Sequence, residues 1–381
     1  MAATDAQARE DLTDRLLDHL ALMCVTGEEA AIADAVAARY EALGEPVVRV
    51  GNSVVAGAPD PDRQRPLVLL VGHLDVVPPT SDDRDPRVQS RHDGQVVVGR
   101  GASDMKAGNV VAMRAFEDAA LRADSPYDLA LVLYAGEEGG ADVNELRALL
   151  AEVPWLTDAA LAIVLEPTDG QVQLGCLGGL HALLTFRGRQ AHSARPWHGR
   201  NALTLASPFL AELDRDHLVD TEVDGIAYRD VWSVTQGWTD GLGPDATATT
   251  VPVRNVIPGS FTINLNLRFS PSRGLAEAED ELRAYVGERA EIEIIDRVPP
   301  APPHRHDPLV QAFVAAVDAE VAGKQAWTDV ARFTEVGVPA LNYGPGLTAQ
   351  AHQRGEFVPV DAVVDADVRL RRFLRGEAAA T

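Results

Sequence analysis

Three apolar segments, each followed by a loop that contains glycine or an acidic residue, constrain the fold of this chain most. They are LVLLVG at 67–72, LALVLY at 129–134 and LAIVL at 161–165. Runs as continuously apolar as these are typical of strands that are covered on both faces of a sheet. Helical patterns lie between them at 107–123 and 143–152. Because strand and helix alternate, the order predicts an α/β layer with a mainly parallel sheet.

The pattern changes after about residue 176. The following segments read as half-exposed strands and amphipathic helices, in the order 180–188, 201–216, 260–270, 275–287 and 291–295. Strands that alternate polar and apolar residues are typical of a sheet with one face in solvent. This part of the sequence therefore predicts a small α+β domain. A helix at 308–323 and a strand at 339–344 follow it.

The charge balance of the chain excludes some classes of partner. It has 34 basic and 57 acidic residues, which gives a formal net charge of −23. General binding of nucleic acid or of an anionic membrane requires basic surfaces, so we expect neither partner. The N-terminal residues have no apolar stretch of the secretory type, and no apolar run is long enough to cross a bilayer. The two cysteines, Cys24 and Cys176, form no metal or disulfide motif, which favours a reducing, cytoplasmic location.

Five short stretches carry residues that could perform chemistry, and four of them directly follow a predicted strand. They are GHLDVVP (72–78), GRGASDMKAG (99–108), YAGEEGG (134–140), LEPT (165–168) and GLTAQAHQRGEF (346–357). In open α/β sheets, ligands bind outside the carboxyl ends of the strands. We therefore expect these stretches to approach one another.

Two of these stretches contain possible metal ligands, and each of these residues could instead have an ordinary structural role. In an extended segment His73 and Asp75 face the same side, so the Asp75 carboxylate can accept from one ring nitrogen and leave the other for a metal. The alternative is a buried histidine that is merely satisfied by the aspartate. Asp104 could hold two cations with its two oxygens, or it could simply cap the following helix.

Three further stretches add acids and a second histidine. Of the adjacent pair Glu137 and Glu138, one could bind a metal while the other acts as general base, or both could form a solvated turn. Glu166 could be an exposed strand end, and His352 a surface histidine. Taken together, however, these residues match a two-zinc or zinc/cobalt hydrolase site. If Glu166 and His352 serve one cluster, the 186 residues between them (352 − 166) contain an inserted domain.

The five stretches, in this order, resemble those of the M20 metallopeptidases. The resemblance implies two divalent ions, expected to be Zn²⁺ with Co²⁺ as an alternative. Their implied ligands are His73 and Glu166 for one ion, Glu138 and His352 for the other, and Asp104 as the bridge. It further implies that Asp75 orients His73, that Glu137 is the general base and that the Asp104–Met105 peptide is cis.

The segment RGRQAHSARPWHGRNA (187–202) resembles the start of the family's lid and dimerisation domain. By this resemblance, His192 reaches the partner's site in a homodimer and stabilises the oxyanion. Four more stretches resemble substrate-contacting segments, and they supply Asn255, Arg268, Thr328, Arg332 and Gly344. The implied domains are a discontinuous metal-binding catalytic domain, 1–176 and 298–381, and a ferredoxin-like lid and dimerisation domain, 177–297.

Within the family, the segments GCLGGL (175–180) and AHQRGEF (351–357) resemble the succinyl-diaminopimelate desuccinylases. The implied reaction converts N-succinyl-L,L-2,6-diaminopimelate to succinate and L,L-diaminopimelate, for lysine and cell-wall biosynthesis. Such a small anionic N-acyl amino acid needs a fixed guanidinium, for which Arg268 and Arg332 are candidates. The alternatives are another M20 amidohydrolase, similar to acetylornithine deacetylase or to a carboxypeptidase, and a non-catalytic binding protein on the same scaffold.

Overall fold

The computed structural model divides the chain into two compact units. It describes residues 2–22, 24–60, 62, 64–79, 91–140, 142–216, 218–240 and 254–379. Unit 1 consists of Met1–Gly175, His304–Ala322 and Asp329–Thr381, and unit 2 consists of Cys176–Pro303 and Gly323–Thr328. Cys176 and residues 298–303 and 323–328, which were predicted to belong to the catalytic domain, thus lie in unit 2. The roles expected for the two domains stay predictions.

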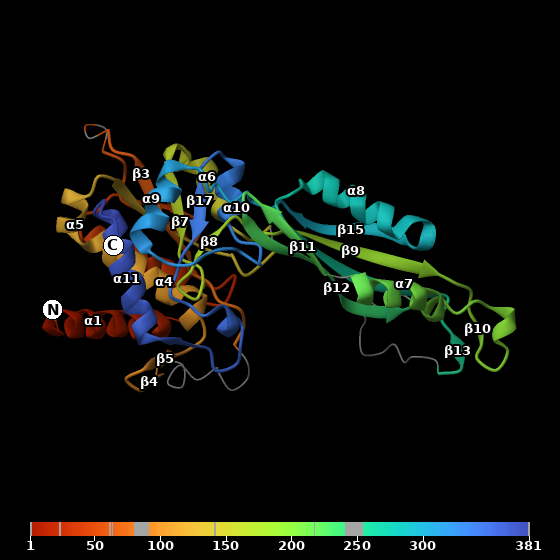
Figure 1. Ribbon diagram of the computed structural model, residues 1–381. Coiled ribbons are helices and arrows are strands. Elements are labelled where there is room, and N and C mark those ends of the chain that lie inside the picture. Colours follow the sequence, from red (N-terminus) through yellow and green to blue (C-terminus); the bar gives the residue numbers. More distant parts are fainter. Residues whose placement is uncertain are drawn as a thin grey trace. The chain divides into compact units, whose positions relative to one another are not determined.

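Unit 1 is built on an eight-stranded mixed sheet with the order β1-β2-β6-β3-β7-β17-β8-β16 (Figure 1). Its strands are β1 (Val47–Val50), β2 (Ser53–Ala56), β3 (Leu67–His73), β6 (Asp128–Tyr134), β7 (Leu161–Val164), β8 (Val172–Leu174), β16 (Val321–Gly323) and β17 (Ala340–Asn342). The neighbours β6, β3, β7 and β17 run parallel, whereas β1, β2 and β8 pair antiparallel. Every residue of β3, β6 and β7 is buried, as the continuous apolar runs predict. The predicted α/β class is confirmed.

A second, three-stranded sheet in unit 1 contains β4 (Arg91–His92), β5 (Val96–Val98) and β18 (Phe357–Pro359). The helices of unit 1 are α1 (Ala2–Ala21), α2 (Ala30–Ala42), α4 (Ala107–Glu117), α5 (Ala119–Asp124), α6 (Leu146–Glu152), α9 (Pro308–Val317), α10 (Val330–Glu335) and α11 (Val360–Leu374). Short helical turns lie at η1 (Ala102–Lys106), η2 (Pro154–Asp158) and η5 (Thr348–Gln350).

Three predicted helices are shorter than expected, and one of them, 143–152, begins only at Leu146 as α6. The predicted helix 107–123 is divided into α4 and α5, because Asp118 leaves the helical conformation and its Oδ1 accepts from Leu121 N at 3.0 Å. This is an N-cap, which a short polar side chain forms in competition with the helix itself. The predicted helix 308–323 ends at Val317, since Asp318 adopts a left-handed conformation with φ 51°.

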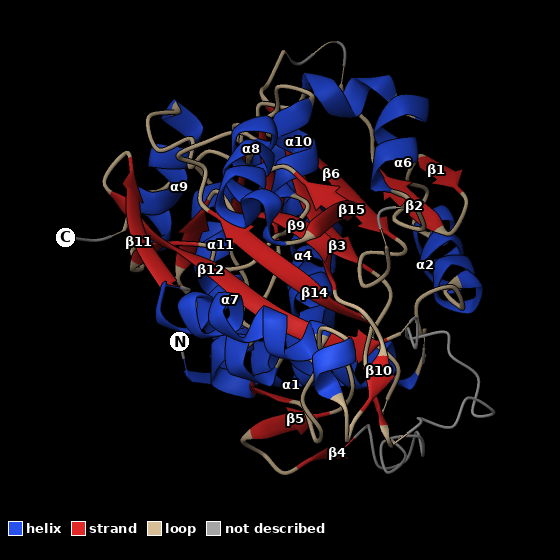
Figure 2. Cartoon of the chain, turned by 90° about the vertical axis from the view of Figure 1, so that its right-hand side faces the viewer, coloured by secondary structure: helices blue, strands red, loops and turns tan. Residues whose placement is uncertain are grey.

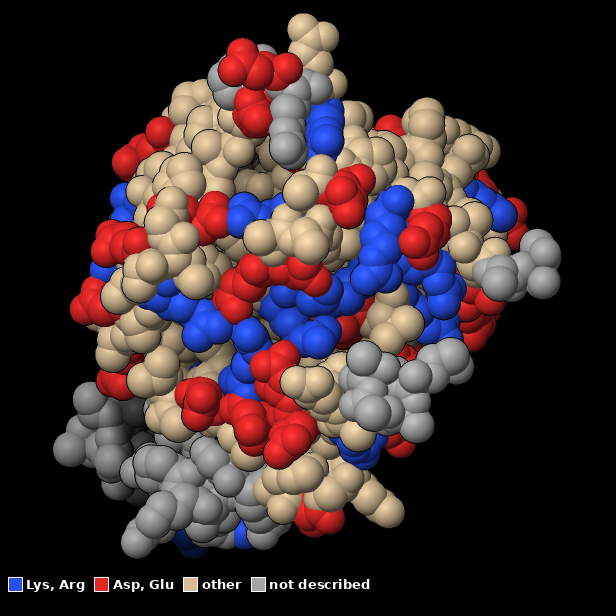
Figure 3. Space-filling view, turned by 90° about the vertical axis from the view of Figure 1, so that its left-hand side faces the viewer, with Lys and Arg blue, Asp and Glu red and all other residues tan. Residues whose placement is uncertain are grey.

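Ion pairs join α1, α4 and α11, which contact one another in unit 1 (Figure 1). Arg114 on α4 pairs with Asp11 on α1 at 2.7 Å and with Asp367 on α11 at 2.5 Å. Arg371 pairs with Asp367 at 3.0 Å. Figure 3 shows a face of the molecule on which a band of Lys and Arg side chains is bordered by Asp and Glu. Many arginines of this acidic chain are therefore compensated locally.

Unit 2 is built on a five-stranded antiparallel sheet with the order β11-β12-β14-β9-β15. Its elements are β9 (Gly178–Arg187), β10 (Ala191–His192), η3 (Pro196–His198), α7 (Ala202–Asp216), β11 (Leu218–Val223), β12 (Ile226–Thr239), β13 (Val256–Ile257), β14 (Ser260–Phe269), α8 (Leu275–Val286), η4 (Gly287–Arg289) and β15 (Glu291–Val298). Without the edge strand β11, the connection β9-α7-β12-β14-α8-β15 and the order β12-β14-β9-β15 are those of a ferredoxin-like fold. In this unit α7 contacts β9 and β14, and α8 contacts β15 (Figure 2).

The core of unit 2 explains why its sheet is only half buried. Alternate residues of β9 and β14, such as Leu184 and Leu265, pack with Phe209 of α7 and Leu282 of α8 in one cluster. The opposite face of the same strands carries polar side chains, among them Thr185 and Thr262, which are only half-buried. Within the described ranges, no helix is both long enough and apolar enough to cross a membrane.

Candidate metal centre

The predicted metal ligands of unit 1 come from neighbouring ends of the parallel strands. His73 is the last residue of β3, Glu137 and Glu138 follow β6, and Glu166 follows β7. The carboxyl ends of these three strands meet at one edge, because β6, β3 and β7 are adjacent and parallel. Asp104 reaches the group from η1, where the Asp104–Met105 peptide is cis, as the family resemblance implies.

Four of the five predicted ligands lie within short distances of one another. His73 Nε2 is 3.3 Å from Asp104 Oδ1. His352 Nε2 is 2.9 Å from Glu138 Oε2 and 3.7 Å from Asp104 Oδ2. One ligand atom each of His73, Asp104 and Glu138 lie within 4.8 Å of one another. Imidazole and carboxylate groups at such distances fit a divalent ion such as zinc, with Asp104 between the two histidines.

Glu166, the fifth predicted ligand, is buried beside this group. It is 5% exposed, and its negative charge is one of the causes that raise the pKa of the neighbouring Glu137. Two glycines allow the backbone to approach it closely. A Cβ at Gly344 would lie 2.3 Å from Leu165 O, and a Cβ at Gly108 would lie 2.1 Å from the same oxygen. Gly344 therefore has a packing role, and its predicted contact with substrate stays a prediction.

Asp75 holds the Glu137–Glu138 pair rather than the ring of His73. Its Oδ1 accepts from Glu137 N at 3.0 Å, and its Oδ2 accepts from Glu138 N at 3.0 Å and from Thr26 Oγ1 at 2.8 Å. His73 Nδ1 lies 3.0 Å from the backbone oxygen of Asp75 and 3.6 Å from its carboxylate. The predicted hydrogen bond from His73 to the Asp75 carboxylate is thus replaced by one to its carbonyl.

Glu137 is half-buried and has several acidic side chains as neighbours. Burial raises the pKa of Glu137 well above its ordinary value, and the charges of Glu166 and Asp329 act in the same direction. The nearby His73 acts in the opposite direction. Burial alone would lower the pKa of His73, but its bond to Asp104 and the charge of Glu137 raise it well above the ordinary value. Acids and imidazoles held together in this way are suited to share a cation.

Asp329, which the sequence analysis missed, anchors the predicted substrate residue Arg332. Arg332 Nε donates to Asp329 Oδ1 at 2.6 Å. The other oxygen of Asp329 accepts from Tyr134 Oη at 2.6 Å and from Asn144 Nδ2 at 2.9 Å. All four residues are buried in unit 1. The positive charge of Arg332 is therefore compensated. In the sequence, the only sign of this ion pair was that an aspartate precedes the arginine by three residues in TDVARF.

A buried glutamate from the late stretch GLTAQAHQRGEF was also missed. Glu356 is 2% exposed and accepts from the backbone amides of Gly101, Ser103 and Asp104 and from the side chain of Arg100, at 2.8–2.9 Å. Burial raises the pKa of Glu356 to about 7. The sequence signal was only its position four residues after His352.

The other predicted site residues belong to unit 2. His192 and Asn255 are exposed, and His192 Nδ1 accepts from Ala194 N at 3.0 Å. Thr328 is buried, and its carbonyl oxygen lies 3.6 Å from Cys176 Sγ. Arg268 is half-buried on β14, where its Nε donates to Asn266 Oδ1 at 3.1 Å. Burial lowers the pKa of Arg268, and among the described residues it forms no ion pair.

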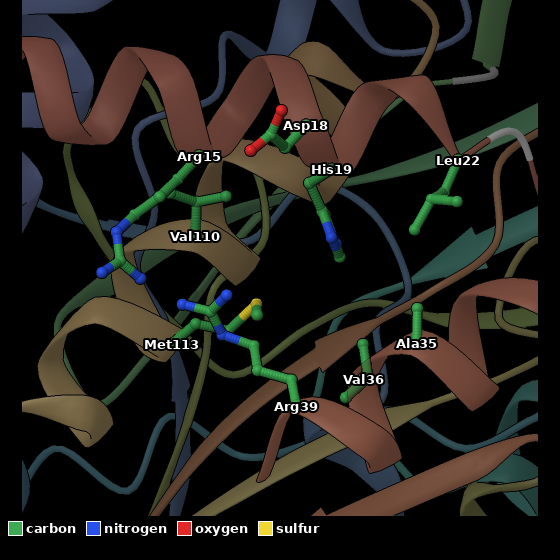
Figure 4. Close-up of a pocket in the computed structure, with 9 residues that line it drawn as sticks. All are labelled: Arg15, Asp18, His19, Leu22, Ala35, Val36, Arg39, Val110 and Met113. Carbon is green, nitrogen blue, oxygen red and sulfur yellow. The ribbon is translucent and has the colours of Figure 1, made fainter. Parts of the chain in front are cut away.

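Unit 1 also contains a cavity of about 170 Å³ between α1, α2 and α4 (Figure 4). Its lining is Arg15, Asp18, His19, Leu22, Ala35, Val36, Arg39, Val110 and Met113. His19 points into it, and no described group hydrogen bonds to its Nε2. None of the predicted site residues is in this lining, so the cavity is not part of the metal centre.

Comparison with known proteins identifies the family of this chain. The family "Peptidase family M20/M25/M40" matches residues 69–375. A Mycobacterium tuberculosis protein, named as a candidate succinyl-diaminopimelate desuccinylase, is 37% identical over 96% of this chain and 98% of its own. The succinyl-diaminopimelate desuccinylase of Corynebacterium glutamicum is 34% identical over 95% of both chains.

Among solved structures, aminopeptidase PepT from Bacillus cereus has the same fold. The two superpose with a TM-score of 0.74 at 16% sequence identity, and 97% of this chain and 98% of that chain are covered. A family match over most of the chain, and relatives more than 30% identical over nearly the whole length, are sufficient to assign it. The chain is a member of peptidase family M20/M25/M40.

Proposed function

We propose that this protein is a metal-dependent amide hydrolase that removes the succinyl group from N-succinyl-L,L-2,6-diaminopimelate. The reaction class is supported by the short distances among the side chains of His73, Asp104, Glu138 and His352. These residues lie up to 279 positions apart in the sequence (352 − 73). The substrate is favoured by the desuccinylase names of the two relatives above.

The five predicted ligands, Glu166 included, would hold two zinc ions, with cobalt as a substitute. Zinc at such a site polarises an amide carbonyl and lowers the pKa of water to about 7. The two oxygens of Asp104 face the two histidines, at 3.3 Å from His73 Nε2 and 3.7 Å from His352 Nε2. This placement supports Asp104 as the bridging ligand.

Glu137 would act as the general base. It takes a proton from the attacking water and gives it to the leaving amine, while Asp75 fixes its backbone through the 3.0 Å bond to Glu137 N. A raised pKa, as burial produces at Glu137, makes a carboxylate a better proton acceptor near neutral pH. Its neighbours Glu138 and Glu166 would be neutralised by the metal and leave Glu137 for proton transfer.

Arg268 is the stronger of the two arginine candidates for a substrate carboxylate. Its guanidinium is held by the neutral Asn266 and forms no ion pair among the described residues, whereas Arg332 is already paired with Asp329. A partly desolvated guanidinium gains most from a carboxylate partner.

We further propose that the enzyme works in the cytoplasm as a homodimer. In this dimer His192 stabilises the oxyanion in the partner's site. The residues Asn255, Thr328 and Gly344 contact the substrate.

An amide-hydrolysis panel on zinc-reconstituted protein tests this function. The panel contains N-succinyl-diaminopimelate, N-acetylornithine and a dipeptide. We expect the succinylated substrate to have the highest kcat/KM and the rate to disappear when the metal is removed by a chelator. A higher kcat/KM on the acetylated substrate or the dipeptide would show that the protein has another activity of the family. No hydrolysis of any amide would support a non-catalytic binding protein.

The variant Glu137→Gln tests the general base. Because proton transfer by a positioned carboxylate contributes about 10²–10⁴-fold, kcat should fall by that factor while the zinc content stays the same. The matched control is Glu152→Gln at the exposed end of α6, which should keep the wild-type rate. A Glu137→Gln enzyme with wild-type kcat would remove Glu137 from this role.

A further inference from the structure

Glu356 connects the two loops that carry Asp104 and His352. Its Oε1 accepts from Ser103 N at 2.8 Å and from Asp104 N at 2.9 Å. Its Oε2 accepts from Arg100 Nη1 at 2.8 Å and from Gly101 N at 2.9 Å. One buried carboxylate thus satisfies three backbone amides of a single loop, and the last of them belongs to Asp104 itself.

The backbone around Glu356 is paired with the same loop. Gly99 N donates to Glu356 O at 2.9 Å, and Ser103 Oγ donates to Phe357 O at 2.7 Å. The pairing continues into the small sheet, where Phe357 on β18 lies opposite Val98 on β5. The segment that leads from His352 is therefore fixed to the segment that leads to Asp104, although the two are about 250 residues apart in the chain.

We infer that Glu356 is a positioning residue that sets the 100–104 loop, so that the Asp104 carboxylate faces both histidines before any metal ion binds. This inference rests on the metal centre of the proposed function. It assigns Glu356 no contact with substrate or metal. Its effect is to reduce the reorganisation that metal binding would otherwise require, as is common for groups that hold metal ligands in place.

The chemistry of the contact requires a carboxylate. Above its raised pKa of about 7, Glu356 is an ionised carboxylate, which accepts four hydrogen bonds and donates none. A glutamine at this position has one acceptor oxygen, and its NH₂ group would face two of the four donors. Buried donors that lose their acceptor are costly, so the loop would shift to find other partners. Asp104, at the end of this loop, would move with it.

The first experiment compares zinc binding by Glu356→Gln with that of the wild type. The matched control is Asp230→Asn in unit 2, because Asp230 is a buried carboxylate that accepts from Ser270 N and Arg273 Nη1, each at 2.6 Å. Zinc affinity is measured by competition with a chromogenic chelator, at a temperature where circular dichroism shows every variant folded. The visible spectrum of the Co²⁺ form reports the geometry of the ligands.

We expect Glu356→Gln to weaken zinc binding by about 10- to 100-fold and to change the Co²⁺ spectrum, while Asp230→Asn changes neither. Wild-type zinc affinity and an unchanged spectrum in Glu356→Gln would overturn the inference. If that variant does not fold, Glu356→Asp replaces it, since it keeps the charge but is one methylene shorter. It should bind zinc more weakly than the wild type, and wild-type affinity would again contradict the proposal.

A second measurement uses the wild-type protein alone. If Glu356 sets the loop in advance, the amides of Gly101, Ser103 and Asp104 should be protected from hydrogen exchange in the metal-free protein. Exchange of these amides at the rate of an unfolded chain would refute the inference whatever the variants do. A wild-type protein that shows this protection but binds no zinc would refute the proposed function instead.

Discussion

Asp75 shows how one carboxylate can place two others. Its two oxygens accept from the amides of Glu137 and Glu138, each at 3.0 Å, so both side chains leave the backbone from fixed positions. The ring of His73 is oriented by the Asp75 carbonyl instead. In this way Asp75, two positions after the ligand His73, fixes the backbone of the proposed base and of another ligand in the turn after β6.

The variant Asp75→Asn should therefore impair both functions of the acidic pair. Because the amide has one acceptor oxygen for two backbone donors, we expect zinc affinity and kcat/KM each to fall by about 10- to 100-fold. The comparison is Thr26→Val, which removes only the 2.8 Å bond to Asp75 Oδ2 and should change both by much less. Equal effects of the two substitutions would show that Asp75 does not hold the pair.

Which residues could be predicted from the sequence depends on where their partners lie. His73 ends one apolar strand, and Glu137, Glu138 and Glu166 follow two others, so the local pattern is enough to bring them to one sheet edge. The partners of Glu356 belong to a loop about 250 residues earlier, and nothing in the local sequence indicates that pairing. The same holds for the carboxylate of Asp75, because its acceptor role depends on the backbone of another loop.

Close contacts between elements also constrain the site. The segment after β17 approaches the segment after β7 so closely that a Cβ at Gly344 would lie 2.3 Å from Leu165 O and 2.5 Å from Glu166 O. A backbone oxygen cannot move away as a flexible side chain can. The helix break at Asp118 has a similar local cause, and the apolar pattern that continues across it concealed the break from the sequence analysis.

The variant Gly344→Ala should destabilise unit 1. Overpacking of this kind costs about 1–3 kcal/mol, which denaturant-induced unfolding can measure. The control is Gly274→Ala at the start of α8, where the nearest atom to an added Cβ is 3.9 Å away on the flexible side chain of Glu277. Equal unfolding free energies for Gly344→Ala and the wild type would contradict the close approach of the two segments.

The packing of α1 on α2 and α4 makes the stability of the folded protein depend on pH. Burial, with the charges of Lys106 and Arg39, lowers the pKa of His19 to about 3. The unfolded chain, with an ordinary pKa near 6.5, binds a proton that the folded state excludes. Stability is therefore complete above about pH 6.5 and falls as the pH is lowered toward 3.

Between pH 6.5 and 5, His19 should reduce the free energy of unfolding by up to about 2 kcal/mol, at 1.36 kcal/mol for each pH unit. The variant His19→Leu cannot take up this proton, so its unfolding free energy should fall less over the same interval. Denaturant unfolding at the two pH values measures both slopes. Parallel slopes for the two proteins would show that His19 titrates normally in the folded state.

At the scale of the whole molecule, the order of elements along the chain was sufficient to predict the α/β class and a small α+β insertion, whereas its ferredoxin-like topology was implied by the family resemblance. The limits of the inserted unit were not predictable in full. Residues 323–328 return to unit 2 after α9 of unit 1, because Leu177 N donates to Ala326 O at 3.1 Å and Trp327 Nε1 to Pro299 O at 3.1 Å. Such a return leaves no signal in local composition.

The metal centre proposed here consists of five side chains from distant parts of unit 1 that hold two divalent ions. Anomalous diffraction at the zinc edge, from crystals grown with zinc, would locate these ions. We expect two peaks about 3.5–4 Å apart, with Asp104 between them, His73 and Glu166 on one, and Glu138 and His352 on the other. A map with no zinc peak among these side chains, while zinc is bound elsewhere, would contradict this proposal.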